Sequence, residues 1–211
     1  MDAALCRAWM DRFAELVTAE ADRLTALDAA IGDGDHGVNM RRGMRAAGAA
    51  LADSPPEMPG AVLVATGRAL VAKTGGAAGP LYGTGLRRAG KALGDAGTVT
   101  PEDVGEALAA MLAGIQSLGE AVEGDKTMVD ALIPAVAAFK AGTGNGLAAA
   151  AQASAAAAAE GAEATVPMQA RKGRASYLGE RSIGHQDPGA TSAALLVRAL
   201  ADVTNDPEGA S

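Results

Sequence analysis

Aromatic residues and cysteine are scarce in this sequence, and each shortage excludes a class of protein. Phe, Trp and Tyr together make up 2 % of the 211 residues, and β-branched residues are also few. This composition disfavours a β-sandwich or a β-barrel, whose strands are rich in both kinds of residue. The single cysteine, Cys6, has no partner for an internal disulfide, which is typical of a reducing compartment. We expect Cys6 to pack as a small apolar side chain.

Positive charge and long apolar runs are lacking too. The chain carries 18 Lys and Arg against 25 Asp and Glu, for a net charge of −7, and the basic residues form no stripe. Such a chain is a poor candidate for binding nucleic acid. No apolar run approaches the roughly 18 residues of a membrane span, and the first 20 residues contain four acidic side chains. The sequence therefore predicts neither a membrane-spanning helix nor a signal peptide, and we expect a cytoplasmic protein.

Alanine and glycine are abundant instead. Alanine accounts for about a quarter of the chain, glycine for 28 residues, and hydrophobic residues as a whole for 49 %. Alanine together with leucine favours helices, and this hydrophobic content argues against disorder. The length suits one domain, which we expect to be all-α and to span residues 1–211.

Apolar spacing and capping signals predict about eight helices. They run over about residues 3–26, 38–51, 60–72, 80–94, 100–119, 127–141, 146–159 and 187–203. In the first of them Glu20 interrupts the apolar stripe, so the helical pattern is weaker in its second half. Thr100 and Asp187 are typical N-cap residues, and a proline follows each. The sequence contains no credible strand and no evident domain boundary.

The residues best suited to binding and catalysis fall in four of the connections between these helices. The four connections cover residues 30–37, 74–79, 120–126 and 171–187, and they alternate with three plain spacers. In an up-down bundle with short loops, every odd-to-even connection lies at the same end. We therefore expect these four segments to converge into a functional site at one end of the bundle.

The first of these segments holds a cluster of acidic residues. Asp28, Asp33 and Asp35 follow a D-x4-D-x-D spacing, and three carboxylates this close repel one another unless a cation neutralises them. Carboxylate oxygens are hard ligands that suit Mg²⁺ or Ca²⁺. The cluster is not an EF-hand, because Met44 stands where that motif has glutamate. The alternative is that Asp28 caps a helix and the other two are solvated turn residues.

One glycine-rich stretch suits a phosphate, and two others nearly match known nucleotide-binding fingerprints but fail. Residues 32–37 fit G-x-G-x-x-G, but a helix precedes them where a dinucleotide site needs a strand. Residues 85–92 nearly match a P-loop, but they lie within a helix and lack its Ser or Thr. Residues 75–79 instead enter a helix whose first N–H groups suit a phosphate, unless they form only a flexible turn. Met128 suits contact with a nucleobase or a place in the core.

A small basic group and both histidines fall in the same segments. Arg171, Lys172 and Arg174 suit phosphate oxygens, with a solvated run of charge as the alternative. His36 and His185 suit phosphate binding, proton transfer or a phosphoryl-carrier role, with a hydrogen-bonded turn histidine as the alternative.

Taken together, these motifs resemble those of the L subunit of bacterial dihydroxyacetone kinase, DhaL, and of the C-terminal domain of ATP-dependent dihydroxyacetone kinases. The matching stretches are residues 27–37, 75–83, 124–128 and 169–190, and the resemblance covers nearly the whole chain. It implies an all-α, antiparallel up-down barrel of about eight helices, with the nucleotide site at one end.

The resemblance also implies the cofactors and the site residues. Two Mg²⁺ ions would be held by Asp28, Asp33 and Asp35 and bridged to the phosphates of ADP or ATP. The residues implied to line the nucleotide are His36, Gly37, Val38, Asn39, Ala77, Ala78, Gly79, Gly119, Met128, Arg174, Asp187, Pro188 and Gly189. Those implied to be catalytic are Asp28, Asp33, Asp35, His36 and Arg174. Ala78 departs from the family, in which serine is common at this position, so one hydroxyl donor to phosphate is absent.

The activity that the resemblance implies is phosphoryl transfer in three proteins. ADP would stay bound as a coenzyme, and a phosphohistidine on a phosphotransferase-system partner, DhaM, would convert it to ATP. The γ-phosphoryl group would then pass to dihydroxyacetone held on the substrate-binding subunit, DhaK. Two alternatives stay open at this point. One is a subunit that uses exchangeable ATP for another small ketose, and the other is a nucleotide-state sensor that binds a transcriptional regulator.

Overall fold

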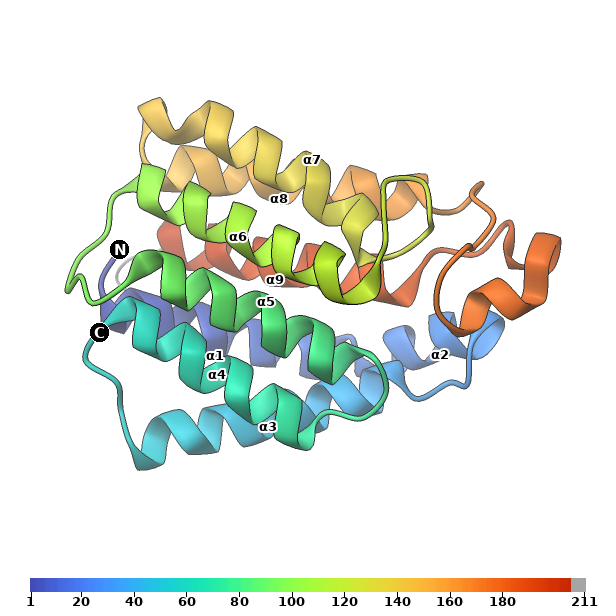
Figure 1. Cartoon of the computed structure of the whole chain (residues 1–211), viewed down its shortest axis with the longest axis horizontal. Coiled ribbons are helices and arrows are strands. Elements are labelled where there is room, and N and C mark those ends of the chain that lie inside the picture. The colour runs from blue at the N-terminus through green and yellow to red at the C-terminus, as the bar shows by residue number, and fades with distance from the viewer. Residues whose placement is uncertain (206–211) are drawn as a thin grey trace.

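The computed structural model describes residues 1–205, which fold into an antiparallel bundle of helices (Figure 1). Within these residues there are nine α-helices, two 3₁₀ helices and no strand, only an isolated bridge between Asp2 and Thr98. The elements are α1 (Ala3–Ala19), α2 (Ala21–Ile31), α3 (His36–Asp53), α4 (Pro59–Lys73), α5 (Ala78–Leu93), α6 (Pro101–Gly119), α7 (Met128–Gly142), η1 (Thr143–Asn145), α8 (Leu147–Ala164), η2 (Arg174–Ser182) and α9 (Pro188–Asn205). Across residues 1–205, no helix combines the length and the apolar character that crossing a bilayer requires.

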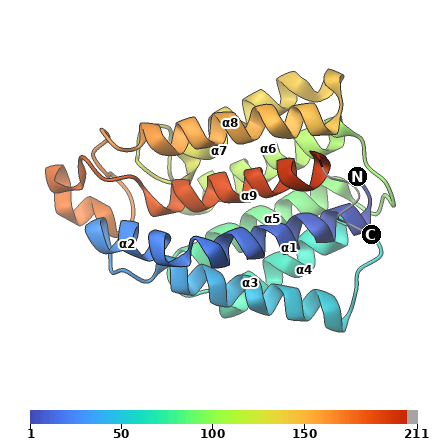
Figure 2. The same ribbon diagram turned by 180° about the vertical axis from the view of Figure 1, so that it is seen from behind.

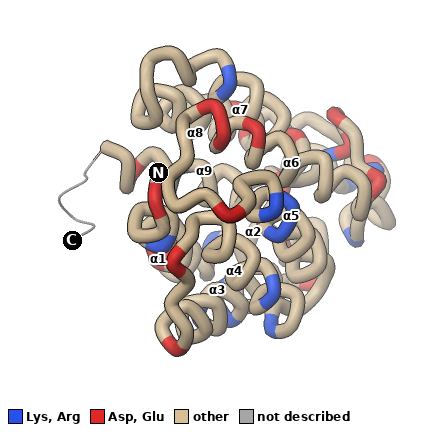
Figure 3. The backbone as a smooth tube through the Cα atoms, turned by 60° about the vertical axis from the view of Figure 1, so that its left-hand side comes forward, with Lys and Arg blue, Asp and Glu red and all other residues tan. Residues whose placement is uncertain are grey.

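The helices close into a barrel. From α3 to α9 each α-helix packs on the one before it, and α9 also packs on α1, which closes the ring. Figures 1 and 2 show the N-terminus and the last described turn of α9 at one end of the barrel and α2 with η2 at the other. Figure 3 brings the end with the N-terminus forward and shows Lys and Arg interspersed with Asp and Glu around the ring. The predicted all-α, antiparallel up-down barrel is therefore confirmed.

Local capping explains where several helices begin. The Thr100 hydroxyl accepts a hydrogen bond from Asp103 N at 3.2 Å, and Asp103 accepts from Thr100 N in return, so the predicted cap is a full capping box. The predicted cap at Asp187 is also present, because its carboxylate accepts from Ala190 N at 2.7 Å. These caps satisfy N–H groups that the first turn of a helix leaves without a partner.

One expectation about the helices is wrong. The helix expected over residues 3–26 is two helices, α1 and α2, which meet at Glu20. The polar Glu20 interrupts the apolar face, and α2 then buries its own apolar side chains and continues to Ile31, so Asp28 lies within a helix. The long connection before the last helix contains η2, which has a kink at Gly179, where φ is +57°.

The interior is built from small side chains with a few large ones. Trp9 and Phe13 are almost fully buried, and the Trp9 indole N–H donates to Leu196 O at 2.8 Å. Cys6 is fully buried, as predicted, and burial raises the pKa of its thiol to about 12. Glycines let α4 and α5 approach closely, since a Cβ at Gly83 would lie 2.7 Å from Gly67 O.

Candidate functional site

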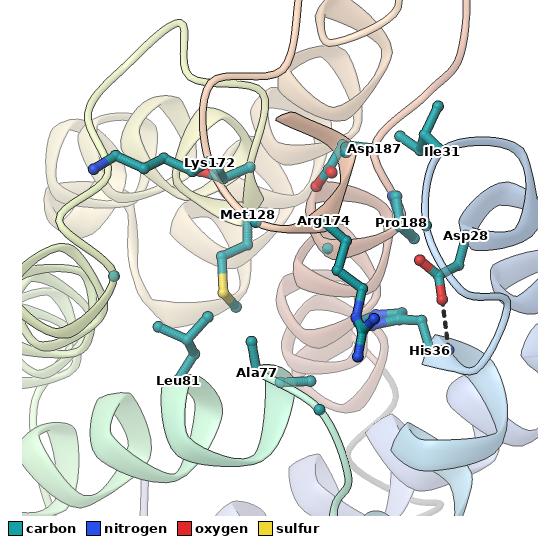
Figure 4. Close-up of a pocket in the computed structure, with 18 of the residues that line it drawn as sticks. Asp28, Ile31, His36, Ala77, Leu81, Met128, Lys172, Arg174, Asp187 and Pro188 are labelled. Atoms are coloured by element: carbon teal, nitrogen blue, oxygen red, sulfur yellow. Dashed lines mark hydrogen bonds between the residues drawn. The ribbon is translucent and has the colours of Figure 1, made fainter. Parts of the chain in front are cut away.

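A pocket of about 290 Å³ opens at the end of the barrel away from the N-terminus (Figure 4). Its walls come from the connections after α2, α4, α6 and α8 and from the helix ends that flank them. These are the four segments that the sequence predicts to converge, and the structure brings them together. Of the residues implied to act in the site, the pocket is lined by Asp28, Asp33, Asp35, His36, Asn39, Ala77, Ala78, Gly119, Met128, Arg174, Asp187, Pro188 and Gly189.

Three carboxylates gather on one side of this pocket. One carboxylate oxygen from each of Asp28, Asp33 and Asp35 lies within 4.8 Å of the other two. Asp28 also caps α3, because its Oδ2 accepts from Asp35 N at 2.8 Å and from His36 N at 3.1 Å. The capping interpretation of Asp28 therefore holds, and its cap is compatible with a place in the carboxylate cluster. The hard oxygen donors and the short separation fit a divalent cation such as Mg²⁺.

The turn that carries these carboxylates depends on a glycine. A Cβ at Gly32 would overlap Oδ1 of Asp28, so a side chain at this position would displace that carboxylate. The backbone N–H of Gly32 donates to Asp28 O, which ends α2 next to the cluster. The local sequence thus brings backbone and carboxylate close together, as a metal-binding turn requires.

A cation from the last connection faces the acidic cluster. Nη2 of Arg174, at the start of η2, lies 3.1 Å from Oδ2 of Asp33. Figure 4 shows the Arg174 side chain extending toward His36. Both partners of the ion pair are partly exposed, with 69 % of the Arg174 side chain open to solvent. The guanidinium is therefore accessible to an anionic ligand in the pocket.

His36 is held by a chain of hydroxyl groups that leads into the core. Its Nε2 is hydrogen-bonded to Ser192 Oγ at 2.9 Å, and Tyr82 OH lies 2.7 Å from the same oxygen. Because Ser192 donates to Gly189 O at 3.0 Å, it accepts from Tyr82 and from Nε2–H of His36. Burial lowers the pKa of His36, and the Asp28 and Asp35 carboxylates oppose that shift. Burial therefore disfavours the charged form of the His36 imidazole.

The loop between α4 and α5 places a helix N-terminus against the pocket. The first turn of α5 has no side-chain cap, so its N–H groups are available to a ligand. A Cβ at Gly75 would lie 2.6 Å from Oδ1 of the buried Asn39, and Gly76 has φ of +64°. Two glycines are thus required for the loop to lie on Asn39.

The opposite wall is more apolar and includes a buried acid. Leu81, Ile115 and Met128 line this side, so Met128 belongs both to the core and to the pocket. Asp187 is 8 % exposed, and burial raises its pKa to about 7, against the opposing effects of the Ala190 N–H and the Lys126 ammonium. An apolar wall facing polar and charged groups is typical of a pocket for a small organic anion.

Three residues implied by the resemblance lie outside the lining of the pocket. Gly37 packs its backbone against α2, where a Cβ would overlap Ala21 O. Gly79 is buried against Thr74 O at a Cβ distance of 2.6 Å. Val38 is 46 % exposed and lines a separate groove between α1 and α3. Successive positions in the first turn of a helix point in different directions, so neighbours of His36 and Ala78 need not share their surroundings.

Comparison with known proteins identifies the family. Residues 30–202 match the DAK2 domain. The chain belongs to the DAK2 domain family. It is 42 % identical over 195 residues to the Escherichia coli PEP-dependent dihydroxyacetone kinase ADP-binding subunit DhaL, covering 92 % of this chain and 93 % of that protein.

Two further relatives support this assignment to the DAK2 family. The chain is 42 % identical over 192 residues to the ADP-binding subunit DhaL of Listeria innocua PEP-dependent dihydroxyacetone kinase 1, covering 91 % of this chain and 92 % of that one. The crystal structure of the C. freundii dihydroxyacetone kinase in complex with AMP-PNP and Mg²⁺ matches with a TM-score of 0.73 at 30 % identity. The match covers 94 % of this chain and 34 % of that one.

In this DAK2 domain the structure adds residues that motif reasoning missed. Ser192, in α9, is hydrogen-bonded to His36, and Tyr82, in α5, is hydrogen-bonded to Ser192. Both look like ordinary helix residues, and no local signal marks them. Lys126 lies within a predicted segment, but its spacing gives no indication that its ammonium is buried. Of the residues proposed from charge, Lys172 reaches the pocket, whereas Arg171 and His185 are not in its lining.

Proposed function

We propose that this chain is the nucleotide-binding subunit of a dihydroxyacetone kinase, with ADP and Mg²⁺ in the pocket and residues 1–211 acting as one domain. The observation that carries the proposal is the meeting of three carboxylates, an arginine and an uncapped helix N-terminus around one pocket. Such a set suits phosphate oxygens together with their counter-ion. The identity to DhaL subunits supports this choice of nucleotide and reaction.

The charge balance favours two Mg²⁺ ions. Asp28, Asp33 and Asp35 together carry about three negative charges, and ADP adds about three more. Two divalent ions would offset about four of these six, and the Arg174 guanidinium would offset another. Mg²⁺ supplies charge neutralisation and alignment of phosphate oxygens when it is bound.

The remaining residues would orient the nucleotide. The backbone around Ala77 and Ala78 would donate to phosphate oxygens, so the missing serine hydroxyl at position 78 is not essential. Arg174 would exchange Asp33 for phosphate oxygens, which match the fork of its N–H donors. Met128 and Leu81 would hold the base on the apolar wall. His36 would keep its fixed neutral ring beside the phosphates.

The proposed reaction consists of two phosphoryl transfers and involves three proteins. A phosphoryl group would pass from a phosphohistidine of a DhaM-like protein to the β-phosphate of ADP, and the freed imidazole would keep its electron pair. The same group would then pass from ATP to a hydroxyl of dihydroxyacetone on a DhaK-like subunit, and that hydroxyl would lose its proton. Phosphoryl transfer needs alignment and charge neutralisation more than covalent help, so a subunit without a substrate pocket is sufficient. We expect this assembly in the cytoplasm.

The test is to mix the purified chain with DhaK-like and DhaM-like partners and to compare phosphoenolpyruvate with ATP as the phosphoryl donor. We expect phosphoenolpyruvate-dependent product and ADP retained on the chain through purification. Steady turnover on free ATP without the DhaM-like protein would instead assign an ATP-using subunit, for dihydroxyacetone or another small ketose. If the chain instead retained a transcriptional regulator and supported no phosphoryl transfer, it would be a nucleotide-state sensor.

A further inference from the structure

The ammonium of Lys126 is buried and has a complete set of partners. Lys126 is 1 % exposed, whereas Lys73, Lys91 and Lys140 are exposed and Lys172 is half-buried. Its Nζ donates to the backbone oxygens of three residues at distances from 2.5 to 3.1 Å, namely Thr165, Met168 and His185. An ammonium has three protons to donate, so none is left for a ligand. Within residues 1–205 this lysine forms no ion pair with a carboxylate.

The three acceptors mark the two ends of the connection between α8 and α9. Thr165 follows the last residue of α8, and His185 stands shortly before the cap of α9 at Asp187. Two more bonds join the same ends, from Asp187 N to Thr165 Oγ1 at 2.9 Å and from Gly184 N to Val166 O at 2.8 Å. These hydrogen bonds hold the two ends of the connection, which form its base, next to each other. The Lys126 ammonium donates three of them.

The same connection carries groups of the candidate site. Arg174 projects from it to Asp33 at 3.1 Å, and Asp187 ends it against the pocket. Another bond, from Arg171 N to Asp125 O at 3.0 Å, ties the middle of the connection to the residue before Lys126. An exposed arginine on a long loop would otherwise lose conformational freedom when it binds a ligand.

The backbone of Lys126 is held in a conformation that side chains rarely adopt. Its φ is +62°, in the left-handed region that favours glycine. Hydrogen bonds on both sides maintain it, since Asp125 accepts from Val122 N at 2.9 Å and Asp130 accepts from Gly124 N at 2.6 Å. Such backbone strain persists only where the surrounding structure enforces it, and it is concentrated at functional sites.

We propose that Lys126 is a positioning residue of the nucleotide site, because its ammonium fixes the base of the 165–187 connection and thereby places Arg174 and Asp187. Lys126 lines the pocket, but backbone oxygens accept from all three of its donors, so it would act through the connection and not by donating to the ligand. The choice of ADP as the reporting ligand rests on the proposed function. Whether Lys126 holds the 165–187 connection in place does not depend on which ligand binds.

The experiment compares Lys126→Met with Lys140→Met. The first variant keeps an unbranched side chain and removes all three donors, and the second makes the same change at an exposed lysine at the far end of α7. One measurement is the rate at which an arginine-specific protease cuts after Arg171, Arg174 and Arg181 in the absence of nucleotide. The other is the Kd for ADP in Mg²⁺, from calorimetry.

We expect Lys126→Met to be cut at these sites at least about tenfold faster, because the loop opens locally without global unfolding. Its Kd for ADP should rise about 10–100-fold, the range typical of residues that orient a metal site. Lys140→Met should match the wild type in both measurements. Wild-type cleavage and wild-type affinity in Lys126→Met would overturn the proposal. A wild type that binds no ADP would overturn the proposed function, while the cleavage rates would still decide the role of Lys126.

If Lys126→Met does not fold, acetylation of the wild type decides. Lys126 should react with acetic anhydride at least about tenfold more slowly than Lys73, Lys91 and Lys140, since its amine is enclosed. Molecules acetylated at Lys126 should be cut in the connection faster than molecules acetylated only at the exposed lysines. Equal reactivity of the four lysines, or equal cleavage of the two populations, would overturn the proposal.

Discussion

Replacing Asp33 by asparagine should separate ligand binding from folding. Asp33 is 37 % exposed in its side chain, and its ion pair is with the partly exposed Arg174. Exposed ion pairs contribute about 0–1 kcal/mol, so the free energy of unfolding should change little. The same change removes one of three carboxylates gathered within 4.8 Å of one another. A full charge and a metal ligand are lost, so the effect on binding should be far larger than the effect on stability.

The expected loss of ADP affinity in Mg²⁺ is at least about 100-fold, or roughly 2.7 kcal/mol. The assay is calorimetry on nucleotide-free protein at fixed Mg²⁺, with circular dichroism and a thermal melt on the same sample. Asp22→Asn, at an exposed acidic position on α2, is the matched control and should behave as the wild type. An ADP affinity within twofold of the wild type, with helicity intact, would refute the assignment of Asp33 to the metal.

Three other predictions follow from the site. Tyr82→Phe removes the hydroxyl that donates to Ser192 and should lower the free energy of unfolding by about 1 kcal/mol in urea titrations. Burial raises the pKa of Asp187 from 3.8 to about 7, so its stabilising contribution is present below pH 4 and is lost as the pH rises to 7. The stability of the wild type relative to Asp187→Asn should therefore fall over that range by up to about 4 kcal/mol. EDTA should release ADP from loaded protein into a filtrate.

Each of these predictions has a result that contradicts it. Unchanged stability of Tyr82→Phe would show that the hydroxyl chain to His36 is dispensable for folding. A difference between wild type and Asp187→Asn that does not vary with pH would mean that Asp187 titrates alike when folded and unfolded. ADP that stays bound in excess EDTA would show that the nucleotide does not depend on a divalent cation.

Helix caps and the pattern of connections could be predicted, because they depend on residues that are close in the sequence. The caps at Thr100 and Asp187 and the alternation of plain and residue-rich connections depend on neighbours in the chain, and they indicated the ends of helices and the functional end of the barrel. The up-down topology then brings the four segments together without further information.

Features that depend on tertiary packing were not predictable. Whether Glu20 bends or ends a helix depends on what lies against α1 and α2. Ser192 on α9 meets both His36 on α3 and Tyr82 on α5 only in the folded barrel. Nothing in the sequence distinguishes Lys126 from a surface lysine, because its burial depends on the distant 165–187 connection that packs against it.

The central claim is that a bound nucleotide carries the phosphoryl group. The most direct test is a single turnover, in which the chain loaded with ADP and Mg²⁺ meets a DhaM-like protein labelled on its phosphohistidine, with no substrate-binding subunit present. We predict that the label moves to ADP and that one ATP per chain stays bound through gel filtration. Label that stays on the histidine, or that appears only in free ATP, would contradict the account.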